Sequence, residues 1–422
     1  MSLIVQKYGG TSVADPDRMR AVAENVAFTK RHGADVVVVV SAMGKATDNL
    51  ISLAGQVSTS RPGREMDMLL TTGERVAAAL LTMALADLGV AAVSFTGSQV
   101  GIITDTTHGK AKIVEVKGDR VRDALAAGKV PVVAGFQGVS TAKEITTMGR
   151  GASDLTASAL AKALVADACE IYTDVTGVFS ADPRIVPRAR KLPRVSFDEM
   201  LEMAGAGSKV LALRSVEFAR NHGVSLHVRS AFTWEPGTWV TDSPIIDETE
   251  RGMEDPIISG VVTDSSESKV TVHRVPDRPG VSAQLFEPLA DASVNVDMIV
   301  QNVSTEGTTD ISFTMPSADM HVAEDIVRRV ADEIGAAGVT HDDGIARLSV
   351  VGAGMKSSPG VAAKMFRTLA DEDVNIEMIS TSTIRISVVI AIGDVERAAR
   401  ALHTAFGLDA GTDYAAPLPE RR

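Results

Sequence analysis

Residues 5–19, VQKYGGTSVADPDRM, combine the end of an apolar run, a glycine turn and the start of a helical pattern. Lys7 stands directly before Gly9 and Gly10, whose missing Cβ atoms let backbone amides approach an anion closely. Lys7 is therefore either an ordinary charged residue at a strand end or the cation of a phosphate site. This segment alone does not decide between the two.

The segments that follow alternate short Val/Ile/Ala runs with helical patterns up to about residue 230. One run, DVVVVVSAM at residues 35–43, is apolar on both faces, as a strand between two helix layers would be. The alternation predicts an α/β fold with a mostly parallel sheet covered by helices on both faces.

Bulk properties narrow the class of protein. A chain of 422 residues should hold two or more domains. The net charge of −12 argues against nucleic acid or an anionic membrane as the main partner. The single cysteine, Cys169, is expected to be a buried apolar side chain in a reducing compartment. No signal peptide is evident, and no apolar run approaches the ~18 residues of a membrane helix, so a cytoplasmic location is predicted.

A repeat follows the α/β region. Residues 231–256 are rich in prolines, acids and turn residues and predict a last strand and a linker. PGVSAQLFEPLADASVNVDMI starts at Pro279 and PGVAAKMFRTLADEDVNIEMI at Pro359, and 12 of the 21 paired positions are identical at an offset of 80. Each copy predicts turn, helix and strand, so two α+β modules stand in tandem. Pro288 should kink or shorten the first of these helices.

Charged residues collect in the predicted loops at strand ends. Ligands bind at the carboxyl ends of the strands in open α/β sheets. Each residue alone also suits a helix cap, a dipole partner or a solvated charge. Together they fit phosphoryl transfer, which needs charge positioning more than covalent chemistry. The set comprises Lys7, Arg150, Arg184 and Lys209 with Glu74, Asp154 and Asp174.

Several motifs carry a family resemblance. KYGGTS, VVVVSAM, TTGER, SFTGSQ, VAGFQG, GRGASD and YTDVTGVFSADPR resemble the aspartate kinases of the amino-acid-kinase fold, and the two repeats resemble their paired ACT domains. The chain looks like the lysine- and threonine-regulated, α-subunit type. The implied fold is a three-layer amino-acid-kinase sandwich followed by two ferredoxin-like ACT domains. Its implied parts are a catalytic domain (1–240), a linker (241–256), a first ACT domain (257–345, with 257–264 available to complete the second), a second ACT domain (346–408) and a polar tail (409–422).

The resemblance implies a reaction and a set of site residues. ATP with Mg²⁺ would phosphorylate the β-carboxylate of L-aspartate, the first step toward lysine, threonine, methionine and diaminopimelate. Lys7 and Asp154 would be catalytic, and no metal ligand is assigned among the side chains. The substrate residues would be Ser41, Thr47, Glu74 and Arg150. The nucleotide would contact Lys7, Gly9, Gly10, Thr11, Thr173, Asp174, Phe179, Arg184 and Lys209.

The resemblance also implies regulation and assembly. Lysine and threonine would bind at the ACT domains through Asp277, Asn295, Asp297, Gln301, Ser304, Asn375 and Ile376. The chain would form a homo-oligomer, or an α2β2 assembly with a β subunit equivalent to residues 253–422 that starts at Met253.

Four positions depart from the family pattern. Ala152 replaces a glycine in GRGASD, and Thr176 replaces an acid in the nucleotide loop; Ala362 and Thr383 alter the second ACT motif. If position 152 required a positive φ, alanine there would be strained. An active aspartate kinase, a paralogue with weakened feedback or a related acceptor, and a catalytically silent regulatory subunit therefore all remain open. The retained charged residues favour the first.

Overall fold

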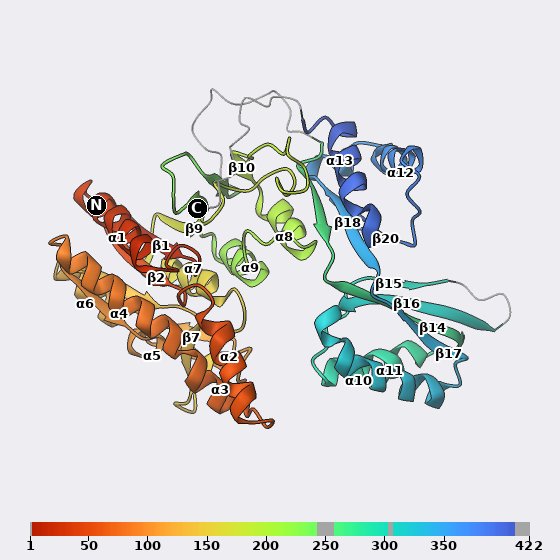
Figure 1. The fold of residues 1–422 in the computed structure, drawn as a ribbon, viewed down its shortest axis with the longest axis horizontal. Coiled ribbons are helices and arrows are strands. Elements are labelled where there is room, and N and C mark those ends of the chain that lie inside the picture. The colour runs from red at the N-terminus through yellow and green to blue at the C-terminus, as the bar shows by residue number, and fades with distance from the viewer. Residues whose placement is uncertain (1, 243–256, 303–306, 410–422) are drawn as a thin grey trace. The chain divides into compact units, whose positions relative to one another are not determined.

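The structure is a computed structural model that describes residues 2–242, 257–302 and 307–409 (Figure 1). Ser304, Met253, most of the predicted linker and most of the predicted tail lie outside the described residues. The chain divides into two compact units, which are treated separately below. The first unit comprises Met1–Val178, Lys191–Ala204 and Lys209–Glu248, and the second comprises Phe179–Arg190, Gly205–Ser208 and Thr249–Arg422.

An eight-stranded sheet forms the centre of the first unit, in the order β10-β12-β11-β9-β1-β2-β6-β3. Every neighbouring pair is parallel except β11 with β12. The strands are β1 (Leu3–Tyr8), β2 (Asp35–Val40), β3 (Ala92–Phe95), β6 (Val130–Ala134), β9 (Ala168–Thr173), β10 (Arg194–Val195), β11 (Leu226–Ser230) and β12 (Thr238–Val240). The predicted α/β class with a mostly parallel sheet is confirmed.

Helices cover this sheet. The Asp15 side chain caps the first of them by accepting a hydrogen bond from the Arg18 amide, and Pro16 occupies the first turn, where its missing N–H has no intrahelical acceptor. α1 and α4 share an apolar cluster with the valines of β2 and β6, while α7 contacts β1, β9 and α9. The helices of this unit are α1 (Pro16–Arg31), α2 (Ala46–Val57), α3 (Gly63–Leu70), α4 (Thr72–Asp87), α5 (Gly97–Val100), α6 (Asp119–Ala126), α7 (Ala152–Leu164), α8 (Phe197–Gly205) and α9 (Leu213–His222).

A second, smaller sheet lies in the same unit, in the order β5-β4-β7-β8. β8 leads directly into the loop that precedes α7, and α3 contacts β8. The sheet therefore supports one side of that loop. Its strands are β4 (Ile102–Thr104), β5 (Ile113–Val116), β7 (Gln137–Ser140) and β8 (Ile145–Thr147).

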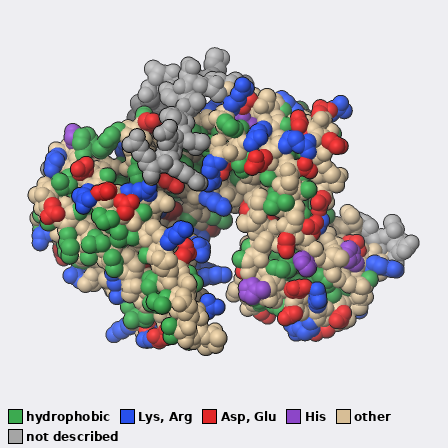
Figure 2. All heavy atoms as spheres, viewed as in Figure 1, with side chains coloured by type: hydrophobic (Ala, Val, Ile, Leu, Met, Phe, Trp, Pro, Cys, Tyr) green, Lys and Arg blue, Asp and Glu red, His purple; other side chains and the backbone are tan. Residues whose placement is uncertain are grey.

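The helical stretch Gly63–Asp87, which holds α3 and α4, is long and apolar enough to cross a membrane by length and composition. The expectation that no segment approaches this criterion is therefore wrong. α4 nevertheless packs against α1, β3 and β6 and buries Glu74, so it is a core helix of its unit. On the face in Figure 2, hydrophobic side chains in the region of α4 are interrupted by charged ones.

The second unit contains the two repeats, each with a four-stranded antiparallel sheet and two helices. The first repeat has β14 (Glu267–Pro276), α10 (Val281–Asp291), β15 (Ile299–Gln301), β16 (Thr308–Pro316), α11 (Met320–Ile334) and β17 (Gly338–Asp342). The second repeat has β18 (Ile345–Val351), α12 (Val361–Asp371), β19 (Met378–Thr381), β20 (Arg385–Ala391) and α13 (Val395–Ala405). Short 3₁₀ turns lie at Ser317–Asp319, Ala353–Ser357 and Ile392–Asp394.

Two details of the repeats follow from their sheets. The strand orders are β15-β16-β14-β17 and β19-β20-β18-β13. β13 (Gly260–Asp264) precedes the first repeat in sequence but pairs with β18 of the second. Pro288 does not shorten α10, because α10 and α12 both have 11 residues.

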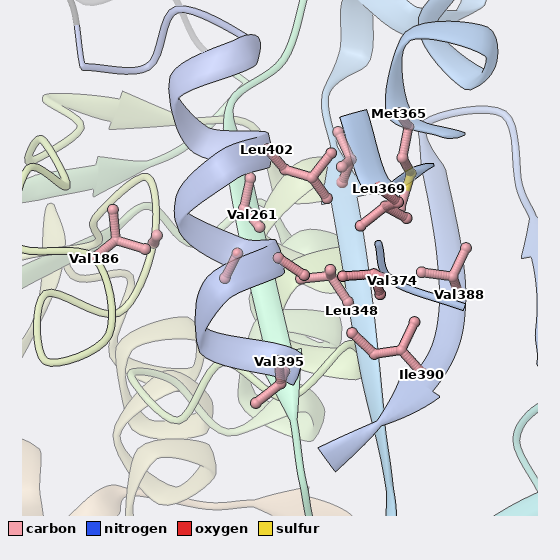
Figure 3. Close-up of a cluster of buried hydrophobic side chains, with 14 of the residues drawn as sticks. Val186, Val261, Leu348, Met365, Leu369, Val374, Val388, Ile390, Val395 and Leu402 are labelled. Atoms are coloured by element: carbon pink, nitrogen blue, oxygen red, sulfur yellow. The ribbon is translucent and has the colours of Figure 1, made fainter. Parts of the chain in front are cut away.

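A segment from the middle of the chain, Phe179–Arg190, packs into the second repeat, so the compact units differ from a continuous domain over 1–240. The Ser180 carbonyl accepts a hydrogen bond of 2.7 Å from the Val261 amide, and the Ser180 hydroxyl lies 2.8 Å from Nε2 of the fully buried His403. Val186 joins the apolar core formed by α12, α13, β13, β18 and β20 (Figure 3). Tertiary packing therefore assigns this segment to the second unit.

Candidate active site

A buried ion pair lies at the carboxyl end of β1. Nζ of Lys7 is 2.6 Å from Oδ1 of Asp154, and only 12% and 9% of these side chains are exposed. Strand alternation turns Lys7 toward α7, because its neighbour Gln6 hydrogen-bonds Thr29 of α1. The other carboxylate oxygen of Asp154 accepts from the Ala212 amide at 3.3 Å. The two residues predicted to be catalytic are thus in direct contact.

The glycine turn after β1 packs tightly against the loop after β2. A Cβ on Gly10 would lie 2.8 Å from the Ala42 carbonyl oxygen, and the Gly10 carbonyl accepts from the Gly44 amide at 3.0 Å. The Gly9 amide already donates to the Tyr172 carbonyl at 3.2 Å, so in this conformation it joins β1 to β9. Ser12, at the end of the turn, buries a hydroxyl that has no hydrogen-bond partner among the described residues.

Glu74 lies in the first turn of α4, beside the same glycine turn, and is only 4% exposed. Its Oε1 accepts from the Ala42 amide at 3.1 Å, while its Oε2 is buried without a hydrogen-bond partner among the described residues. Burial raises the pKa of Glu74 to about 7, and the hydrogen bonds from backbone amides only partly offset that rise. A carboxylate left in this state is suited to receive a cationic group.

Arg150 lies in the loop between β8 and α7, with 91% of its side chain exposed and Asp48 at 3.6 Å. Gly149 and Gly151 on either side have φ of +88° and +73°. Ala152 is the first residue of α7 and is not among the residues with positive φ. The left-handed conformations therefore fall on the two retained glycines, and alanine at position 152 carries no strain of that kind.

The predicted nucleotide residues divide between the two units. Thr173 ends β9 and donates to exposed Asp174 at 3.1 Å, and Lys209 is exposed in the same unit. Phe179 and Arg184 belong to the second unit, where Arg184 pairs with Asp182 at 2.6 Å. Thr176, which stands in the segment after β9 where the family pattern has an acid, buries a hydroxyl that has no hydrogen-bond partner among the described residues.

Ser41 and Thr47 lie in the segment between β2 and the first turn of α2. The Ser41 amide donates to the Tyr8 carbonyl at 3.1 Å, which fixes the end of β2 beside the end of β1. Both residues are partly exposed. This loop is the one that approaches Gly10 and Glu74 through its Ala42 backbone.

One of the predicted effector residues, Asp297, takes part in a pair of reciprocal contacts between the two repeats. Asp297 of the first repeat pairs with Arg347 of β18, and Glu377, the equivalent residue 80 positions later, pairs with Lys269 of β14. Asp277, Asn295, Gln301 and Asn375 are exposed, and Ile376 packs against the core of the second repeat. Arg347 was not predicted. Its acidic neighbours, Asp264, Glu267 and Asp297, lie far from it in sequence, so no local motif marks the position.

Comparisons with known proteins agree with this architecture. Residues 2–230 match the model of the amino acid kinase family, and residues 270–335 and 348–406 each match a model of the ACT domain. An aspartokinase of Mycolicibacterium smegmatis is 55% identical over 411 residues, which are 97% of each chain.

Two solved structures of E. coli aspartokinase III share the fold at 24% identity and cover 96% of this chain and 99% of theirs. The complex with aspartate and ADP (R-state) has a TM-score of 0.79, and the complex with lysine and aspartate (T-state) has a TM-score of 0.73. The model of the amino acid kinase family covers more than half of the chain, and the Mycolicibacterium smegmatis aspartokinase covers nearly all of it. The predicted resemblance is thus confirmed: this chain belongs to the aspartokinases, enzymes with an amino acid kinase domain followed by two C-terminal ACT domains.

Proposed function

We propose that this aspartokinase transfers the γ-phosphoryl group of ATP to the β-carboxylate of L-aspartate in the cytoplasm, giving 4-phospho-L-aspartate for lysine, threonine, methionine and diaminopimelate synthesis. The observation that carries the proposal is the charge arrangement at the carboxyl edge of the large sheet. One buried cation, Lys7, is held by Asp154, and one buried carboxylate, Glu74, lacks a cation among the described residues.

Lys7 acts on the transferring group. A fixed positive charge in a largely buried position stabilises the charge that spreads over the phosphoryl oxygens in the transition state. Asp154 orients Lys7 through the 2.6 Å contact, and the Ala212 amide orients Asp154 in turn. Neither residue needs to remove a proton, because the β-carboxylate of aspartate is already ionised near neutral pH.

The substrate is held by its charged ends. Glu74 receives the ammonium of aspartate at its free Oε2, and Arg150 binds a substrate carboxylate through its planar guanidinium. Ser41 and Thr47 line the same loop. Gly10 and Thr11 face the phosphates, and Gly9 contributes close backbone approach more than a free amide, given its bond to Tyr172. Thr173, Asp174 and Lys209, together with Phe179 and Arg184, hold the nucleotide.

Mg²⁺ is carried by the nucleotide in this proposal. Among the described residues no group of three or more His, Cys, Asp or Glu side chains is placed to hold a metal ion. Magnesium commonly binds through substrate phosphates, water and one or two carboxylates, which this arrangement permits. When bound, the ion would neutralise charge on the β- and γ-phosphates.

Lysine and threonine are the proposed effectors, and they bind where the two ACT repeats meet. The residues are Asp277, Asn295, Asp297, Gln301, Ser304, Asn375 and Ile376. The contact between the Phe179–Arg190 segment and the second repeat supports the idea that effector binding reaches the nucleotide loop. A homo-oligomer, or an α2β2 assembly with a β subunit that starts near Met253, is proposed on the same family grounds.

The test traps the acyl phosphate with hydroxylamine in the presence of Mg²⁺ and ATP. L-aspartate, L-glutamate and D-aspartate are compared, each with and without lysine plus threonine. Hydroxamate from L-aspartate alone, suppressed by the effector pair, is expected. If lysine plus threonine did not suppress the hydroxamate, the proposed feedback would be refuted, but the proposed phosphorylation of aspartate would stand. No product from any acceptor would refute the reaction.

Lys7→Met tests the role of the buried cation. The variant should lower kcat by roughly 10²–10³-fold, the usual effect of removing one fixed group that stabilises transition-state charge. Lys30→Met is the matched control, since Lys30 also pairs with an aspartate, Asp35, at 2.6 Å but at the opposite, amino end of β2. Equal losses in both variants would show that the Lys7 effect is structural.

A further inference from the structure

Arg214, in the first turn of α9, donates to two backbone carbonyls in the neighbourhood of the active-site loop. Its Nη1 lies 2.6 Å from the Met148 oxygen and its Nη2 lies 3.0 Å from the Ala111 oxygen. We propose that Arg214 is a positioning residue for aspartate binding, which fixes the loop that presents Arg150. The proposal rests on the role of Arg150 given above.

The position of the two carbonyls makes this contact specific to the loop. Met148 is the last residue before Gly149, Arg150 and Gly151, and two of these three have positive φ. Glycine-rich backbone of this kind has many accessible conformations when nothing holds it. The Ala111 amide in turn donates to the Thr147 carbonyl at 3.0 Å, so Arg214 closes a bridge between two adjacent loops.

Asp67 of α3 holds the same two loops. Its buried carboxylate accepts from the Thr147 hydroxyl at 2.5 Å and from the Gly109 amide at 3.1 Å, and it contacts His108 at 2.7 Å. Arg214 of α9 and Asp67 of α3 therefore both hydrogen-bond to residues at the start of the β8–α7 loop, Met148 and Thr147. Among the described residues the exposed Arg150 side chain forms an ion pair only with Asp48, at 3.6 Å, so its placement depends on the loop backbone that carries it.

The same turn of α9 also contacts the start of α7, and the two helices lie side by side (Figure 1). Ala212 donates to Asp154, Ser215 lies 2.9 Å from Ser158, and a Cβ on Gly151 would lie 2.5 Å from that of Ala212. These contacts fix the end of the loop that leads into α7. Arg214 fixes the other end, where β8 leaves the sheet.

Loss of the Arg214 side chain should therefore affect the binding of aspartate and not the binding of ATP. Loss of the two hydrogen bonds frees the Met148 end of the loop and spreads Arg150 over more positions, which weakens aspartate binding. Lys7, Asp154 and the Ala212 contact remain, so ATP binding is retained. A general loss of folding would instead weaken both substrates and lower the concentration of active enzyme.

The experiment compares Arg214→Ala and Arg214→Lys with Arg122→Ala in the full-length enzyme without effectors. Arg122 is a matched control because it also donates to two carbonyls, those of Lys117 and Ala163, at 2.7 and 2.8 Å, without touching the β8–α7 loop. Arg214→Ala should raise KM for aspartate about tenfold, which corresponds to a loss of about 1.4 kcal/mol in binding free energy. KM for ATP should change less than twofold, and Arg214→Lys, which keeps one donor group, should fall between.

Added guanidinium ion should restore part of the aspartate affinity of Arg214→Ala and leave Arg122→Ala unchanged. Parallel rises of KM for both substrates, equal behaviour of Arg214→Ala and Arg122→Ala, or an unchanged KM for aspartate would each overturn the proposal. Arg150→Lys separates it from the proposed function. An unchanged KM in Arg150→Lys refutes the role of Arg150, whereas a raised KM there with a normal Arg214→Ala refutes only the present inference.

Discussion

Glu74 in the kinase domain and Glu267 in the ACT unit are both buried glutamates whose pKa is raised chiefly by desolvation. Each has one carboxylate oxygen without a hydrogen-bond partner among the described residues. They differ in their cations. Glu267 lies 2.9 Å from the guanidinium of Arg347, whereas among the described residues Glu74 accepts hydrogen bonds only from the Ala42 amide and the backbone of its own helix.

The difference separates a buried carboxylate that is paired within the protein from one that is available to bind a charged ligand. The chain supplies the partner of Glu267, and Asp264 and Asp297 complete the set around Arg347, which is 2% exposed. No cation of the described residues pairs with Glu74, and the proposed aspartate ammonium would supply one. A buried acid with no internal cation therefore indicates a ligand site more reliably than burial or a raised pKa alone.

The largest expected effect is on the structural side of this comparison. Arg347→Ala leaves three acids near an empty position and should lower the free energy of unfolding by about 3–5 kcal/mol, as for other buried pairs that lose one partner. Urea denaturation measures this. Arg328→Ala removes an exposed pair with Glu324 and should cost less than about 1 kcal/mol. Similar losses in both variants would contradict the structural role of Arg347.

On the binding side, Glu74→Gln should raise KM for aspartate by roughly 10–100-fold, because a charge-assisted hydrogen bond to the ammonium is lost. Its stability should not fall, since a neutral amide avoids the cost of burying charge and still accepts from Ala42. Steady-state kinetics with thermal denaturation gives both quantities. Glu267→Gln should leave KM unchanged without effectors, and a rise there would remove the distinction between the two glutamates.

The pH dependence of aspartate binding follows from the same residue. A pKa of about 7 means that Glu74 of the free enzyme is largely protonated at pH 6 and largely ionised at pH 8. Because only the carboxylate attracts an ammonium, KM for aspartate should fall as pH rises through about 7. Glu74→Gln should abolish this change. A profile in Glu74→Gln that matches the wild type would assign the transition to another group.

The smallest expected effect concerns the second reciprocal pair between the repeats. Lys269 and Glu377 keep 21% and 25% of their side chains exposed, so Lys269→Met should change the free energy of unfolding by about 0.2–1 kcal/mol. The same denaturation assay applies. A loss as large as that of Arg347→Ala would mean that both pairs, not only the buried one, hold the repeats together.

Part of the site could be predicted from sequence because it depends on residue type at a strand end. Lys7, Asp154 and Glu74 each follow an apolar run or start a helix, and parallel strands bring such positions to one edge. Arg214 and Asp67 gave no signal, since they act on backbone groups that every loop possesses. The assignment of Phe179–Arg190 to the second unit depends on packing against α13 and β13, which lie far away in sequence.

β13 makes the second repeat discontinuous in sequence, because the strand that completes its sheet precedes the first repeat. Since this strand completes the sheet of the second repeat, the first repeat is in effect a domain inserted between two strands of its twin. A polypeptide that began after Asp264 would leave β18 with an open edge and would be prone to aggregate. A translation start at Met253 retains β13, so any natural β subunit of this chain has to begin upstream of the repeat it appears to open with.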